Sequence, residues 1–161
     1  MQARGAAAGF TLVELVTVIG MVGVLAAFAA PRFVGTTAFA SRGLYDQAQG
    51  IVRYAQKIAI AQRAGNAPHP LIYVVVTASG ISICYDAACA APASDPSTGS
   101  PLAVSAPAGG AVTLAPVTTF SFDGGGMPSF GSQLEIQVSS SETGDVNRSF
   151  YVEATTGYVH P

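Results

Sequence analysis

One uninterrupted hydrophobic stretch lies near the start of the chain, from Phe10 to Ala30. It contains a single formal charge, Glu14, at its fifth position. As a helix, this stretch would be roughly 31 Å long, about the thickness of the hydrocarbon core of a membrane. The pattern therefore predicts a transmembrane helix over residues 10–30. Because a carboxylate inside such a segment is costly, we expect Glu14 to hold a functional position with a partner.

After Pro31 the hydrophobic pattern changes to that of an amphipathic helix, with apolar side chains every three or four residues. These apolar positions are Leu44, Ala48, Ile51, Val52, Ala55, Ile58 and Ala59. Gly35 and Gly43 weaken the segment between the two patterns, which predicts a kink or local melting there. The sequence therefore predicts one helix from residue 10 to about residue 63, ended by the glycine and proline of residues 65–68.

Beyond Pro70 the pattern changes to that of β-strands, which are rich in β-branched and aromatic residues and separated by turn residues. The predicted strands are residues 71–77, 81–85, 112–122, 134–138, 149–153 and 158–160. Residues 86–110 are rich in alanine, proline, serine and glycine, and they predict a long exposed loop.

Charge is distributed unevenly along the chain. Only 10% of the 161 residues are charged, and the mean hydropathy is +0.44, which suits an exported protein with a membrane anchor. Residues 32–63 carry five basic residues and one acidic residue, whereas residues 64–161 carry one basic residue and seven acidic ones. An acidic head repels phosphate groups, so the composition disfavours nucleic-acid binding there. The basic segment is expected to be a solvated helix face.

The chain contains two cysteines, Cys84 and Cys89. In an exported chain, an even pair at this spacing favours a disulfide that closes a short loop. Zinc binding would require two further ligands, and only His69 and His160 remain as histidine candidates. The sequence therefore favours a disulfide over a metal site.

No group of residues in the sequence predicts catalysis or cofactor binding. His69 and His160 are not placed near a serine, cysteine or aspartate in a way that suggests a triad, and both are expected to be solvated. Asp123 and the three glycines that follow predict a turn, although a calcium ligand there or at Glu142 and Asp145 stays open. We therefore expect a protein that is not an enzyme and holds no cofactor.

Residues 9–15, Gly-Phe-Thr-Leu-Val-Glu-Leu, resemble the processing site of type IV prepilins and type II secretion pseudopilins. In that family a dedicated peptidase cuts after the glycine and methylates the new N-terminal phenylalanine. The resemblance implies cleavage between Gly9 and Phe10, with N-methylation of Phe10. It also implies that the Glu14 carboxylate meets the α-amino group of a neighbouring subunit in a low dielectric. Pro31 matches a proline that many members carry.

Two simpler interpretations compete with this resemblance. The first is an ordinary secretory signal peptide with Arg4 in its basic region and a cleavage site at residues 27–29. Glu14 would then lie inside the apolar region, which is also longer than the usual 7–15 residues. The second is a plain transmembrane anchor, in which the glutamate has no evident purpose.

Three further segments resemble the GspH/FimT family of minor pilins and pseudopilins: residues 51–63, the strand that contains Cys84, and residues 122–128. This resemblance implies an α+β protein in which a long helix packs on an antiparallel, β-sandwich-like head. The implied organisation is a leader peptide at 1–9, a transmembrane or filament-core half-helix at 10–30, an amphipathic half-helix at 31–65 and a periplasmic head at 66–161.

The function implied by these resemblances is structural. The chain is expected to be a minor pseudopilin of a type II secretion system, inserted once in the bacterial inner membrane and then assembled into a periplasmic filament. Its expected partners are other pilins, the prepilin peptidase and the membrane. The alternative is a minor type IV pilin, in pilus assembly or in FimT-like DNA uptake. DNA-binding members of that branch carry two arginines near the C-terminus, and residues 156–160 here, Thr-Gly-Tyr-Val-His, contain neither.

Overall fold

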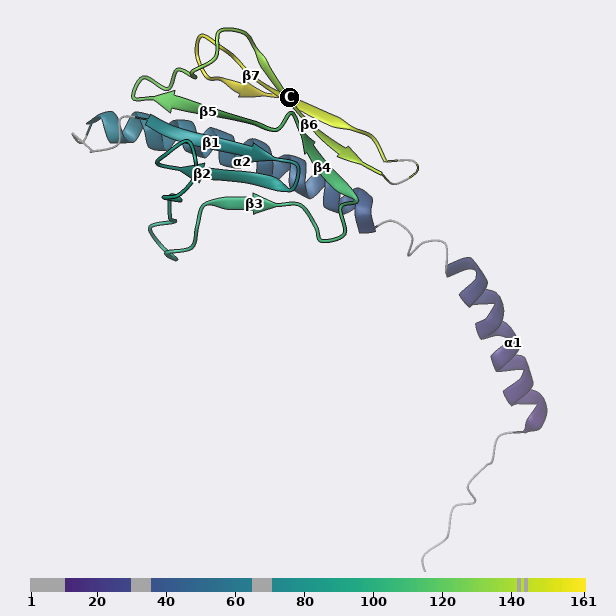
Figure 1. Ribbon diagram of the computed structural model, residues 1–161. Coiled ribbons are helices and arrows are strands. Elements are labelled where there is room, and N and C mark those ends of the chain that lie inside the picture. Colours follow the sequence, from purple (N-terminus) through teal and green to yellow (C-terminus); the bar gives the residue numbers. More distant parts are fainter. Residues whose placement is uncertain (1–10, 30–35, 65–70, 142, 144) are drawn as a thin grey trace, which may run out of the picture. The chain divides into compact units, whose positions relative to one another are not determined.

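The computed structural model describes residues 11–29, 36–64, 71–141, 143 and 145–161 (Figure 1). The chain divides into two compact units, Met1–Thr36 and Thr37–Pro161, and each is described by itself. Helix α1, Leu12–Ala29, belongs to the first unit. Helix α2, Thr36–Ala64, and the strands form the second unit. The junction of the two halves of the predicted helix, residues 30–35, lies outside the described residues.

Helix α2 buries the apolar stripe that the sequence predicts. Leu44, Ala48, Val52, Ala55 and Ala59 are all buried, as is Ile51, and Ile58 is partly buried. The weakening glycine at position 43 lies inside the helix. Because the stripe recurs at helical spacing, one side of α2 can join a common core while the opposite side stays in solvent.

The strands form two antiparallel sheets of four strands each. The first sheet has the order β3-β2-β1-β5 and consists of β1 Leu71–Thr77, β2 Gly80–Cys84, β3 Ala103–Ser105 and β5 Thr118–Asp123. The second has the order β4-β6-β7-β8 and consists of β4 Val112–Ala115, β6 Leu134–Ser140, β7 Arg148–Val152 and β8 Val159–His160. Neighbouring strands pair antiparallel throughout.

The single strand predicted at residues 112–122 is wrong, because the structure divides it between the two sheets. β4 pairs with β6, whereas β5 pairs with β1. The division falls at Pro116, which has no backbone N–H to donate to a ladder and therefore interrupts the strand. The chain changes sheets at this proline, so both sheets can border one core.

The loop predicted at residues 86–110 contains more structure than its composition indicates. Residues 103–105 form β3, which pairs with β2, and Ala93 is buried among the core side chains. Isolated bridges also join Cys84 to Pro92 and Ser94 to Pro101. These pairings use backbone N–H and C=O groups, of which proline still carries the C=O, so the side-chain pattern does not reveal them.

One hydrophobic cluster joins α2 to both sheets. Its largest fully buried side chains include Phe122 of β5, Phe150 of β7 and Ile72 of β1. Each such side chain contributes about 1.5–3 kcal/mol relative to an exposed position. The α+β class, with a helical N-terminal region and an antiparallel β head, is confirmed.

Candidate functional site

The first turn of α1 is closed by a side-chain cap. The Glu14 backbone N–H donates to Thr11 Oγ1 at 3.2 Å, and the Leu15 N–H donates to the Thr11 carbonyl oxygen at 3.2 Å. Threonine followed three positions later by glutamate is the capping-box pattern, a signal that is visible in the sequence. Glu14 therefore also lies where the helix dipole favours a negative charge.

The surface of α1 is apolar on every side. Between Leu12 and Leu25 its large hydrophobic side chains are all at least 51% exposed, and Leu12 reaches 79%. They are Leu12, Val13, Leu15, Val16, Val18, Ile19, Met21, Val22, Val24 and Leu25. A helix that is hydrophobic all round is normally buried by its surroundings. Over the described part of the chain, no helix is both long and apolar enough to cross a membrane.

Of the sequence-predicted processing residues, only Glu14 falls within the described part of the chain. Gly9 and Phe10 lie outside it, so cleavage and N-methylation stay predictions. The Glu14 side chain is exposed, and its carboxylate accepts no hydrogen bond from any described residue. Within the described part of the chain the carboxylate is therefore unpaired, and the role of Glu14 in subunit assembly stays a prediction.

Polar side chains of α2 bind the head at the C-terminal edge of the second sheet. Arg53 donates from Nε and Nη2 to the carbonyl oxygen of Val159, at 3.1 and 2.9 Å. Gln56 donates from Nε2 to the carbonyl oxygens of Gly126 and Thr156, at 3.0 and 2.8 Å. Arg53 is exposed, as expected of a solvated helix face, and its guanidinium also satisfies the Val159 carbonyl of β8.

Two glycines leave room for the Gln56 side chain to reach the carbonyl groups of Gly126 and Thr156. Gly126 and Gly157 have φ angles of +80° and +66°, which L side chains rarely adopt. A Cβ at Gly157 would collide with the Gly126 carbonyl oxygen, and it would lie 2.6 Å from Gln56 Nε2 and 3.0 Å from the Phe122 ring. We call this contact, formed by Gln56, Gly126, Thr156 and Gly157, the glycine seam.

A second polar contact joins α2 to the head near the start of the helix. Arg148 Nη1 donates to Ser41 Oγ at 3.3 Å, to Asp145 Oδ1 at 3.3 Å and to the Val146 carbonyl oxygen at 3.0 Å. The hydrogen bond from Ser41 is the main cause that lowers the pKa of Asp145. Arg148 is the only lysine or arginine after residue 63. These contacts pair its guanidinium with residues of its own chain.

His160 is held by specific contacts rather than being solvated as the sequence predicts. Its Nε2 lies 2.9 Å from Glu153 Oε1, which also accepts a 2.6 Å hydrogen bond from Gln133 Nε2. Its ring stacks on Tyr151 and on Tyr158, with centroids 5.6 and 5.4 Å apart. The hydrogen bond to Glu153, with a smaller contribution from the Pro161 carbonyl, raises the pKa of His160. Reciprocally, the bonds from His160 and Gln133 lower the pKa of Glu153.

These shifts predict a pH dependence of stability. The pKa of His160 in the folded protein is raised above its usual 6.5. The imidazolium therefore stabilises the fold fully below pH 6.5, and this stabilisation is lost as the pH rises through the pKa of His160 in the folded state. Because the pKa of Glu153 is lowered from 4.5, its contribution is present above that pH and is lost as pH falls through the folded pKa. Thermal unfolding of the wild type and of His160→Phe, which keeps a ring for stacking, should differ most at pH 4.5–6.5. A difference that stays constant up to pH 9 would contradict the charged pair.

The remaining candidate residues form turns and a covalent link. Cys84 and Cys89 form the predicted disulfide. Asp123 Oδ1 accepts hydrogen bonds from the N–H groups of Gly125 and Met127, both at 2.8 Å, which supports its interpretation as a turn residue. Within the described residues, no three histidine, cysteine or acidic side chains are grouped so as to hold a metal ion. His69 lies outside these residues.

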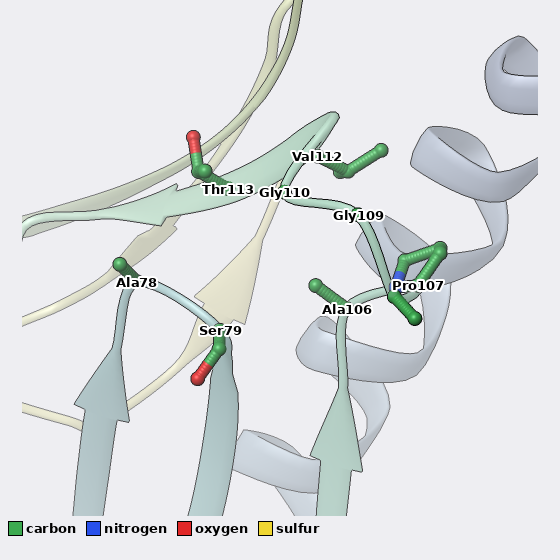
Figure 2. Close-up of a pocket in the computed structure, with 9 residues that line it drawn as sticks. Ala78, Ser79, Ala106, Pro107, Gly109, Gly110, Val112 and Thr113 are labelled. Atoms are coloured by element: carbon green, nitrogen blue, oxygen red, sulfur yellow. The ribbon is translucent and has the colours of Figure 1, made fainter.

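Figure 2 shows a pocket of about 360 Å³ where the turn at Ala78 and Ser79 faces the segment that leads into β4. Alanine, proline and glycine dominate its lining, and Ser79 and Thr113 contribute the side-chain hydroxyls. The lining carries no titratable side chain, so it offers no general acid, general base or charged ligand.

Comparison with known proteins finds likeness to pilus components. No known family profile matches the chain. Over 59 residues the chain is 46% identical to the type IV narrow pilus major component PilA5 of Thermus thermophilus. The matched segment is 37% of this chain and 51% of PilA5. The chain thus spans about half the length of that relative. Two crystal structures of the type IV minor pilin FimU of Pseudomonas aeruginosa superimpose on this chain at 15% sequence identity, with TM-scores of 0.49 and 0.48. The first covers 83% of this chain and 90% of FimU, and the second covers 75% and 88%.

Proposed function

We propose that this chain is a minor filament subunit of the type IV pilin class, with α1 in the filament core and the β head outside it. The observation that carries the proposal is α1: apolar on every side, exposed, and charged only at Glu14 in its first turn. Such a helix is stable when other apolar helices or lipid cover it. The sequence likeness to PilA5 supports the same class.

In this proposal, the chain is first held in the inner membrane by residues 10–30, with its head in the periplasm. Cleavage after Gly9 leaves Phe10 at the N-terminus, where it is methylated. Extraction into the filament then brings the Glu14 carboxylate to the α-amino group of a neighbouring subunit, where each charge offsets the desolvation of the other. The contacts of Arg53, Gln56 and Arg148 keep α2 attached to the head, so α2 and the head enter the filament together.

The mature N-terminus tests this proposal directly. Mass spectrometry of the mature protein should find N-methylphenylalanine derived from Phe10. Gly9→Val should block cleavage, because the family's peptidase accommodates little side-chain volume there, whereas Gly5→Val, the same enlargement four residues earlier, should be processed. A mature N-terminus at Ala30 or Pro31 would instead establish ordinary signal-peptidase processing.

The type of filament needs a separate experiment. The head features that resemble GspH and FimT favour the pseudopilus of a type II secretion system, whereas the likeness to PilA5 favours a type IV pilus. Deletion of the gene should therefore reduce either protein secretion or surface piliation. A deletion strain with normal secretion and normal pili would refute the proposed function.

A further inference from the structure

The outer face of the second sheet is polar and aromatic. Phe150 of β7 is buried and contacts Tyr45 of α2, so Phe150 lies on the inner face. Side chains alternate between the two faces along each strand, which places the neighbours of the buried residues on the outer face. The strand residues of this outer face are Thr113, Ala115, Glu135, Gln137, Ser139, Ser149, Tyr151 and His160. None of these strand residues is a lysine or an arginine.

A carboxylate and a phenol ring are neighbours on this face. Glu135 of β6 and Tyr151 of β7 are directly opposite each other in the strand register. Side chains at opposite positions of an antiparallel pair share one face, with Cβ atoms about 4.5–5.5 Å apart. Glu135 is exposed, and among the described residues none forms a hydrogen bond or ion pair with its carboxylate. A guanidinium can pair with a carboxylate through two N–H groups and can also stack on an aromatic ring, so this pair suits arginine.

The groups on the other side of Tyr151 form a pair of their own. His160 stacks on Tyr151 with ring centroids 5.6 Å apart, and its Nε2 lies 2.9 Å from Glu153 Oε1. A protonated His160 therefore has its counter-ion in Glu153, and a neutral His160 adds no positive charge to the face. In either state of His160, the Glu135 carboxylate has no counter-ion among the described residues.

A shallow hollow lies beside Glu135 on the side away from Tyr151. Strands β4 and β7 flank β6 on opposite sides, and the hollow is at the end of β4. It has a volume of about 220 Å³ and is lined by Ala115, Pro116, Glu135 and Gln137. Because one water molecule occupies about 30 Å³ of the liquid, the hollow has room for part of a side chain. Ala115 and Pro116 offer apolar surface that the alkyl stem of an arginine can cover.

We propose that Glu135, Tyr151 and this hollow form a binding site for an arginine side chain of another protein. The guanidinium pairs with the Glu135 carboxylate and stacks on the Tyr151 ring. The alkyl stem of the same arginine covers Ala115 and Pro116.

The charge of the head supports a cationic ligand. Residues 64–161 carry seven acidic residues and one basic residue, Arg148, whose guanidinium is bonded to Ser41 and Asp145. Arginine fits better than lysine, because a guanidinium is planar, weakly hydrated and able to stack on an aromatic face. A second copy of this chain is disfavoured as the occupant, because a minor subunit meets few copies of itself, a point that rests on the proposed function.

A peptide titration of the full-length chain in nonionic detergent tests the site. The probe is a short glycine peptide that contains two arginines, compared with matched peptides that contain lysine or citrulline at the same positions. Citrulline has the shape of arginine without its charge. The arginine peptide should shift the backbone amide NMR signals of Glu135 and Tyr151, and it should bind roughly tenfold more tightly than the citrulline peptide. Equal binding of these two peptides, or lysine binding as tight as arginine binding, overturns the site.

Substitutions with matched controls assign the binding to the two side chains. Glu135→Gln should weaken binding of the arginine peptide roughly tenfold, because it removes the charge and keeps the shape. Asp46→Asn removes the same charge at an exposed position of α2 and should leave binding nearly unchanged. Tyr151→Leu should weaken binding about threefold, whereas Tyr151→Phe keeps the ring and should bind nearly as the wild type does.

Several outcomes of this series would overturn the site. They are full binding by Glu135→Gln, an equal loss in Asp46→Asn, and a Tyr151→Phe variant that binds as weakly as Tyr151→Leu. Sedimentation of the chain without peptide tests the other occupant: self-association that Glu135→Gln abolishes would overturn the choice of another protein. None of these measurements depends on processing or filament assembly, so failure of the site leaves the proposed function standing.

Discussion

Glu14→Gln and Glu14→Ala should both insert in the membrane normally and fail to enter the filament. Insertion is preserved because each change makes the segment more apolar. Assembly fails because the neighbour's α-amino group then stays charged and unpaired in a low dielectric. Removing one partner of a buried ion pair costs about 3–5 kcal/mol, which corresponds to a loss of incorporation of roughly a hundredfold or more. The measurement is quantitative co-purification of each variant with the other pilins.

A helix-capping role for the Glu14 side chain, which the capping-box pattern allows, is a competing explanation that the same series separates. Glutamine suits the fourth position of a capping box as glutamate does, so Glu14→Gln would assemble normally if capping were the whole role. Thr11→Ala removes the hydroxyl that accepts the Glu14 N–H but keeps the charge. It should cost about 0.5–2 kcal/mol of helix stability and leave incorporation nearly intact. Normal assembly of Glu14→Gln would refute the charge pairing, or place this subunit at a filament tip that has no neighbour above it.

Gly157→Ala should be the most destabilising single-methyl substitution at the contact between α2 and the head. The positive φ angle of Gly157 costs an alanine about 1–2 kcal/mol. The collision of its Cβ with the Gly126 carbonyl and the Gln56 amide adds about 1–3 kcal/mol of overpacking. The expected loss in the free energy of unfolding is therefore roughly 2–5 kcal/mol.

Gly110→Ala is a matched control for the collision. Gly110 has a φ angle of +70°, close to that of Gly157, but an added Cβ there would meet nothing within 4 Å. Its loss should be only the backbone part, about 1–2 kcal/mol. Denaturant unfolding of the detergent-solubilised full chain measures both values. Equal losses at the two glycines would show that the glycine seam tolerates a methyl group and that Gln56 is not held as closely as the distances indicate.

The helices and most strands could be predicted from the sequence because their signals are local. The buried side of α2 follows directly from residues three and four apart, and β1 begins and ends at Leu71 and Thr77 as predicted. The failures lie where pairing partners matter. Residues 112–122 divide at Pro116, and β3 forms inside a segment of small residues because β2 supplies its hydrogen bonds.

In the candidate site, too, the residues that could be predicted are those with a local signal. The sequence indicated Glu14 and the pair Cys84 and Cys89, because an acid in an apolar run and two nearby thiols are each recognisable without a fold. The capping signal of Thr11, three positions before Glu14, is also local and visible in the sequence.

Three features follow from the sequence alone: an apolar helix with one acid, an amphipathic helix and an acidic, strand-rich head. These properties depend on neighbours in the chain. The way in which α2 binds the head follows only from tertiary packing, because Gln56 meets partners 70 and 100 residues away. Tertiary packing also pairs Arg148 with Ser41 and Asp145. Such contacts depend on which strands pair and on the order in which sheets and helix pack, and neither is encoded in local spacing.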